Sequence, residues 1–165
     1  MLGRIGMLLG IAVLCHTSLA EAQGQVNTTT QCIGQFCYTT GTAGGESVNV
    51  TTQRVGQFEY SNGSVGSQTY NATSQRVGQF DYTNGTLGRK PINVTGQQIG
   101  QFNYQNGYVG QQRLNTTTQS IGQFDYTNGT IGSTSYSGTS QRVGQFQYST
   151  GTATTPVYQY DPYDP

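Results

Sequence analysis

Residues 75–86 read QRVGQFDYTNGT, and this pattern returns along the chain with a constant spacing of 22 residues. The six copies begin at Gln31, Gln53, Gln75, Gln97, Gln119 and Gln141. A fixed period of roughly 20 to 50 residues is typical of stacked supersecondary units, because one unit alone cannot bury its apolar face. We therefore expect an all-β fold in which six 22-residue strand-turn-strand repeats stack as a β-solenoid or a hairpin array. The sequence leaves the choice between these two arrangements open.

Aromatic residues alternate with polar ones in every repeat, as in a strand with one buried face. Each repeat places a phenylalanine two residues before a tyrosine. We expect these side chains to form the repeat core or an assembly surface, and they are Phe36, Phe58, Phe80, Phe102, Phe124, Phe146, Tyr38, Tyr60, Tyr82, Tyr104, Tyr126 and Tyr148. A second apolar phase is formed by Val48, Tyr70, Ile92, Leu114 and Tyr136.

Four repeats carry an Asn-Gly dipeptide, a strong signal for a two-residue hairpin turn. The predicted turn residues are Asn62, Gly63, Asn84, Gly85, Asn106, Gly107, Asn128 and Gly129, with Thr40-Gly41 and Thr150-Gly151 in the end copies. In such a hairpin Tyr82 faces Leu87, so Phe80 and both of these residues should share one face. The glycine that follows Leu87 or its equivalent is then expected to mark a β-bulge, at Gly66, Gly88, Gly110 and Gly132.

The two ends of the chain differ from the repeats. Residues 1–22 combine a positive start, an apolar stretch and a small-residue cleavage signal, which predicts a signal peptide and a secreted or cell-surface product. Residues 23–30 form a leader with a partial repeat, 31–155 hold the six repeats, and 156–165 are a Pro/Tyr-rich tail. No other stretch approaches the roughly 20 apolar residues of a membrane span, so none is expected.

Two cysteines remain after the signal segment, Cys32 and Cys37. An exported chain meets an oxidising compartment, so we expect a disulfide between them. Because a fully extended segment would hold them too far apart, the bond requires Gly34-Gln35 to turn or bulge. Intermolecular linkage and a redox or metal role are the alternatives.

The residues that are scarce exclude several functions. Charged residues make up 8% of the chain and its formal net charge is zero, so no basic stripe exists for nucleic acid. The single histidine, His16, lies in the signal segment, which removes histidine-based nucleophilic and metal schemes from the mature chain. Glu59 and Asp81 form the best available acid pair, but both fill the same variable repeat position, typical of surface residues. We expect no enzymatic activity, no cofactor and no metal.

The array resembles curli-type secreted amyloid fibre subunits in its period, export signal and low charge. The curlin repeat carries Gln-x-Gly-x-x-Asn-x-Ala, whereas this chain has Gln75-x-x-Gly78-Gln79-Phe80 with Asn84 later. The resemblance implies fibre formation by stacking across subunits. The spacing Gly78-x-Phe80-x-Tyr82-x-x-Gly85 also resembles the start of a MORN repeat, a hairpin module that serves as a scaffold.

Two functions follow from these features. The first is an exported structural repeat protein of the cell surface or an extracellular or biofilm matrix, self-assembling into amyloid-like fibres or contacting other surface proteins. The second is a monomeric secreted β-repeat binding module for carbohydrate, protein or ice, which would use exposed tyrosine and threonine rows.

Overall fold

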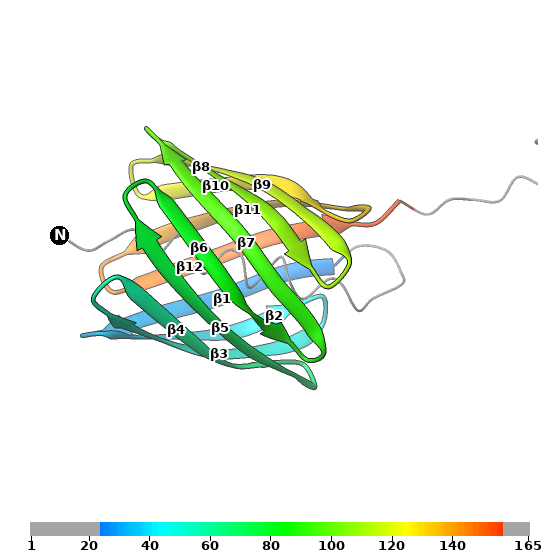
Figure 1. Cartoon of the computed structure of the whole chain (residues 1–165), viewed down its shortest axis with the longest axis horizontal. Helices are drawn as coiled ribbons and strands as arrows, with labels where there is room; N and C mark the ends of the chain where they lie inside the picture. The colour runs from blue at the N-terminus through cyan, green and yellow to red at the C-terminus, as the bar shows by residue number, and fades with distance from the viewer. Residues whose placement is uncertain (1–23, 157–165) are drawn as a thin grey trace, which may run out of the picture.

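The computed structural model describes residues 24–156, which form twelve antiparallel β-strands closed into a barrel (Figure 1). The strands are β1 Gly24–Ile33, β2 Phe36–Ala43, β3 Glu46–Val55, β4 Phe58–Val65, β5 Gln68–Val77, β6 Phe80–Leu87, β7 Lys90–Ile99, β8 Phe102–Val109, β9 Gln112–Ile121, β10 Phe124–Ile131, β11 Thr134–Val143 and β12 Phe146–Thr154. Residues 1–22, expected to be a signal peptide, and residues 157–165 of the tail lie outside the described part of the chain.

Each strand pairs with the next one in sequence, and β1 pairs with β12 to close the sheet (Figure 1, blue beside orange). Phe58 pairs with Val55 on one side and with Gln75, two residues before Val77, on the other. Repeated in every copy, this stagger tilts the strands, which barrel closure requires. The hairpin array is therefore confirmed, and the open solenoid is wrong. Six hairpins in one twisting sheet can remove both free edges by pairing the first strand with the last.

The hairpin turns are not at the Asn-Gly dipeptides, so that prediction was wrong. Asn62 and Gly63 lie inside β4, and the dipeptides of the other repeats lie inside β6, β8 and β10. Thr40-Gly41 and Thr150-Gly151 likewise lie inside β2 and β12. The chain turns instead at Gly34-Gln35 and its equivalents, where the glycine has a φ near 60°, and at a second glycine set that includes Gly66 and Gly88. Those second glycines, expected to be bulges, are the first residues of two-residue turns.

The glycine of each Asn-Gly pair has a different role from the one expected. A Cβ at Gly63 would collide with the backbone carbonyl oxygen of Asn49 and the Cα of Val50 on β3. The glycine is therefore needed where neighbouring backbones approach closely within the sheet, as at the glycine kinks of curved sheets. The repeat that begins at Gln53 holds three glycines, Gly56, Gly63 and Gly66, and the chain turns at the first and the third.

Because β6 runs without interruption from Phe80 to Leu87, these two residues point to opposite sides of the sheet. Leu87 faces the interior and is 1% exposed, whereas Phe80 is 39% exposed on the outer wall. Of the two roles expected for the phenylalanines and tyrosines, the repeat core is therefore wrong, and the assembly surface stays a prediction. The interior apolar cluster consists of Val26, Ala43, Val48, Val50, Val65, Tyr70, Ala72, Leu87, Ile92, Val109, Leu114, Ile131, Tyr136 and Ala153.

The structure contains no helix within residues 24–156 that is long and apolar enough to cross a membrane.

Candidate functional site

The two ends of the barrel have different outer walls. At the end that bears the Gly34-Gln35 type of turn, outward side chains form a continuous ring that we call the aromatic belt. It consists of Ile33, Val55, Val77, Ile99, Ile121 and Val143, the six phenylalanines, and the tyrosines Tyr38, Tyr60, Tyr82, Tyr104, Tyr126 and Tyr148. Each hairpin contributes one aliphatic residue, one phenylalanine and one tyrosine, so the ring reaches the whole circumference of the barrel.

Pairing across each hairpin sets the order of residues within the belt. Val55 pairs with Phe58 next to the turn, and Gln53 pairs with Tyr60 one row further from it. The rings of Phe58 and Tyr60 stack with centroids 6.2 Å apart, and the same contact recurs in the four repeats that follow. Beyond the tyrosines the outer wall becomes polar, beginning with the Thr51–Asn62 pair. The wall therefore changes from apolar at the turns to amphipathic at the tyrosines and then to polar.

Charged side chains at the belt end point into the barrel rather than outward. By strand alternation they share the inner face with the core residues, and they are Arg54, Glu59, Arg76, Asp81, Asp125 and Arg142. The other charged residues within 24–156, Glu46, Arg89, Lys90 and Arg113, lie at the opposite end of the strands. Within residues 24–156 the belt thus contains no charged side chain, and the interior behind it is polar.

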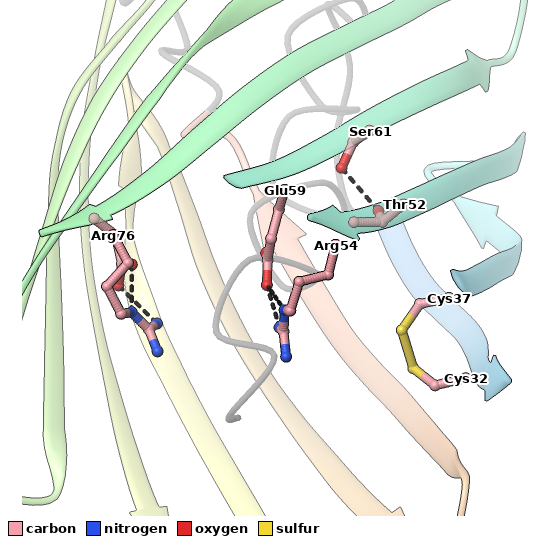
Figure 2. Close-up of polar contacts among 8 residues, drawn as sticks. Cys32, Cys37, Thr52, Arg54, Glu59, Ser61 and Arg76 are labelled. Atoms are coloured by element: carbon pink, nitrogen blue, oxygen red, sulfur yellow. Dashed lines mark hydrogen bonds and ion pairs between the residues drawn. A yellow bond between two sulfur atoms is a disulfide. The ribbon is translucent and has the colours of Figure 1, made fainter. Parts of the chain in front are cut away.

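We call the opening of the barrel at the belt end the mouth. Two ion pairs occupy adjacent hairpins inside it (Figure 2). Arg54 donates to Glu59 through Nε at 2.8 Å and also through Nη2. Arg76 donates to both carboxylate oxygens of Asp81, from Nε at 2.7 Å and from Nη2 at 3.0 Å. Each pair joins residues that face one another across a hairpin. The hydrogen bonds to Asp81 raise the pKa of Arg76, and Glu59 adds a smaller electrostatic contribution in the same direction.

A ring of hydroxyl pairs lies one layer deeper than the ion pairs. Thr30 bonds to Thr39 at 2.9 Å, and Thr52 bonds to Ser61 at 2.7 Å. The hairpin of β7 and β8 breaks this ring, because Gly96 lies there opposite Gln105. A Cβ at Gly96 would meet its neighbours only at ordinary van der Waals distance, so the missing side chain leaves room in the wall.

This break opens a cavity of about 330 Å³ inside the mouth. Its lining residues are Arg54, Gly56, Gln57, Glu59, Ser74, Arg76, Gly78, Asp81, Thr83, Val94, Gly96, Asn103 and Gln105. The Oδ1 atom of Asn103 is buried and has no hydrogen-bond partner among residues 24–156. Further along the barrel the interior is filled by the apolar cluster, which includes Tyr70, Leu87 and Ile92. The cavity therefore ends on a packed core.

The expected Cys32–Cys37 bond is present at the same rim, with Cα atoms 4.0 Å apart (Figure 2). The Gly34-Gln35 turn places the two cysteines directly opposite one another on β1 and β2. Both lie on the inner face, in the position that Arg54 and Glu59 occupy one repeat later.

No family model, curated protein or solved structure matches this chain.

The structure brings the twelve predicted aromatic residues together in one ring, but on the outer wall. Sequence reasoning did not identify the mouth as a site. The sequence did contain an indication of the mouth, because Arg54 and Arg76 are each followed five residues later by an acid. The five residues span the turn at Gly56 or Gly78, so the arginine and the acid face one another across the hairpin. The turn expected at Asn-Gly gave no reason to place these side chains inside a barrel.

Proposed function

We propose that this chain is an exported cell-surface structural protein that seats the belt end of its barrel in the interfacial layer of a lipid membrane. The observation that carries the proposal is the aromatic belt, a ring of exposed apolar side chains in which the nearby charged residues of the described strands point inward. Exposed apolar surface of this extent on a folded protein is typical of an interaction site.

A lipid layer fits the shape of this surface better than a protein partner. One partner molecule would cover one side of the barrel and leave the remaining aromatic residues in water. A fluid layer surrounds the barrel and covers all six repeats at once. The inward orientation of Arg54, Arg76 and Arg142 also avoids placing charges in contact with acyl chains, where they are costly.

The order of the rows matches the polarity gradient of a membrane surface. Valine or isoleucine with phenylalanine lies nearest the turns, and tyrosine, which favours the interface, comes next. The polar Thr51–Asn62 row follows. Two rows of outward residues span about 7 Å along a strand, which suits interfacial seating about 5–10 Å deep rather than the roughly 30 Å hydrocarbon core.

In the turns at the belt end, which would enter the lipid layer first, one backbone carbonyl accepts a hydrogen bond from the neighbouring hairpin. Arg54 N donates to Gln35 O at 2.9 Å, and Arg76 N donates to Gln57 O at 3.0 Å. The same bond links neighbouring hairpins around the rim, ending with Cys32 N to Gln145 O. These bonds lower the cost of moving the rim into a medium with few hydrogen-bonding groups.

Amyloid-like assembly, the fibre half of the sequence-based expectation, would need a free strand edge. In the closed barrel β1 is paired with both β2 and β12, so the twelve described strands offer no such edge. Fibres would therefore require the β1–β12 ladder to open first.

Flotation of the chain lacking residues 1–22 with phospholipid vesicles tests the proposal. Replacing Phe58, Phe80 and Phe102 with serine should weaken vesicle partitioning about 10- to 100-fold, since three partly exposed rings lose their contact with lipid. Replacing Asn62, Asn84 and Asn106 with serine is the matched control, because these exposed residues lie on the same strands outside the belt. The control should float as well as the original chain.

Three results would overturn membrane seating. A folded chain that stays with the aqueous fraction excludes lipid as the occupant of the belt. Equal loss in the phenylalanine and asparagine variants shows that the belt is not responsible. Filaments or a concentration-dependent oligomer formed without lipid, and lost in the phenylalanine variant, assign the belt to contacts between copies of this chain.

A further inference from the structure

The mouth cavity has an unusual charge arrangement for so small a space. Around the rim the charges alternate, as Arg54, Glu59, Arg76 and Asp81 follow one another on consecutive strands β3 to β6. Their formal charges sum to zero. A simple anion or cation would meet repulsion from half of the set, whereas a ligand that carries both charges can face a complementary group with each.

Both cations in the cavity can accept further partners. The Arg76–Asp81 bonds use two of the five N–H donors of a guanidinium. The arginine side chains are 41% exposed at Arg54 and 45% at Arg76, while their acid partners are more buried. A planar guanidinium with donors directed to the cavity suits a phosphate oxygen.

The acceptors in the cavity define the cationic part of the ligand. Glu59 and Asp81 carry negative charge, and the buried Oδ1 of Asn103 lacks a donor among the described residues. That oxygen has almost no exposed surface, so the two carboxylates are the charged acceptors that a ligand donor can reach. A primary ammonium has three N–H donors, whereas a quaternary ammonium has none and is usually held by aromatic faces. Among residues 24–156, no aromatic side chain lines the cavity.

The cavity opens at the same end of the barrel as the aromatic belt. This inference rests on the function proposed above, in which that end of the barrel lies in a membrane. The headgroups of the lipids beneath the barrel then lose contact with water. A polar mouth replaces that water, and the acyl chains extend away from the barrel into the layer.

We propose that the mouth binds the headgroup of a phosphoethanolamine lipid, with its phosphate against Arg54 and Arg76 and its ammonium against Glu59 and Asp81. The break in the hydroxyl ring at Gly96 provides the space for the headgroup. The belt supplies membrane affinity, and the mouth supplies preference among lipids.

The first test is titration of the folded chain with soluble glycerophosphoethanolamine, followed by calorimetry or by amide chemical shifts. We expect saturable binding, with glycerophosphocholine, inorganic phosphate and ethanolamine each at least tenfold weaker. Equal binding of the choline compound or of phosphate alone would overturn the ammonium assignment. Binding of a neutral sugar in place of the headgroup would overturn the ligand class.

The variant Arg76→Gln with Asp81→Asn tests the residues without disturbing the fold, because Gln98 and Asn103 already form this pair in the next repeat. It should weaken headgroup binding at least tenfold. Arg142→Gln with Asp125→Asn is the matched control, since it removes the same charges from the rim outside the cavity, and it should bind within twofold of the original. Equal effects in both variants would overturn the assignment.

Gly96→Ser supplies an independent test, because it restores a hydroxyl to the broken ring and narrows the cavity. It should reduce headgroup binding while leaving vesicle flotation unchanged, and unchanged headgroup binding would overturn the site. The experiments distinguish an incorrect headgroup site from an incorrect membrane function. A chain that floats on all vesicles without binding the soluble headgroup contradicts only the mouth, whereas a chain that does not float contradicts the membrane function.

Discussion

Tyr136 on β11 lies over Gly151 on β12 in the interior of the barrel. A Cβ added at Gly151 would stand 2.8 Å from the phenol oxygen of Tyr136, and one added at Gly138 would collide with the same oxygen. The large inward side chain therefore fits because two glycines leave space for it. Tyr136 is 4% exposed, and its hydroxyl has no hydrogen-bond partner among residues 24–156.

Removing this hydroxyl should stabilise the protein. Tyr136→Phe keeps the ring in place and deletes a buried polar atom that is not hydrogen-bonded, so we expect a gain of about 1 kcal/mol in the free energy of unfolding. Urea unfolding at neutral pH measures it. A loss of stability in the variant would mean that the hydroxyl has a partner in solution.

Tyr136 should also make stability depend on alkaline pH. Burial raises its pKa to about 12, above the value near 10 of an unfolded tyrosine. The folded state then holds its proton more tightly than the unfolded state. This contribution is fully present below pH 10 and is lost between about pH 10 and 12, with a total of about 2–3 kcal/mol. The drop in unfolding free energy over this range should be smaller in Tyr136→Phe than in the original chain.

The Asn-Gly pairs should behave as strand residues rather than turn residues. Gly63→Ala forces a Cβ against the backbone of β3 and should cost about 2–3 kcal/mol. Asn62→Thr changes an exposed residue in the middle of β4 to a better strand former and should lie within about 0.5 kcal/mol of the original. Denaturant unfolding of both variants checks this. A large cost at Asn62 would instead favour the two-residue turn.

The repeat, the all-β class and the hairpin organisation could be predicted from the sequence because they depend on period and alternation, which are local. The side on which Phe80 and Leu87 lie could not. Their relative orientation depends on whether the chain turns between them. Of the two glycine signals, Asn84-Gly85 is the stronger one for a hairpin turn, but the chain turns at Gly78. Choosing the wrong one inverts the orientation of every residue beyond it.

Barrel closure was a second feature that local patterns could not predict. Nothing in one hairpin indicates whether the sixth will meet the first, because closure depends on accumulated twist and stagger over all twelve strands. The mouth follows from closure, since Arg54 and Arg76 become interior residues only when the sheet encloses a space. The Cys32–Cys37 bond needed only the local condition that Gly34-Gln35 turn, which is how the sequence could anticipate it.

The hydroxyl ring should show strong coupling between partners. Thr30 and Thr39 are both buried and bond to each other at 2.9 Å. Thr30→Val alone leaves the Thr39 hydroxyl without its partner and should cost about 1–3 kcal/mol, whereas Thr30→Val with Thr39→Val should be close to neutral. A double-mutant cycle from unfolding measurements gives the coupling directly. Additive costs would show that each hydroxyl is satisfied independently of the other.

The disulfide should stabilise the barrel by a modest amount. Cys32 and Cys37 close a short loop, and loop-closure entropy for that length corresponds to about 2 kcal/mol. The double change Cys32→Ser with Cys37→Ser should lower the unfolding free energy by about that much while the barrel remains folded, because β1 keeps its ladders to both β2 and β12. Adding a reductant to the original chain should reproduce the loss and should leave the double variant unchanged. If the reduced chain unfolds completely, the seam between β1 and β12 depends on the bond far more than the loop entropy alone can explain.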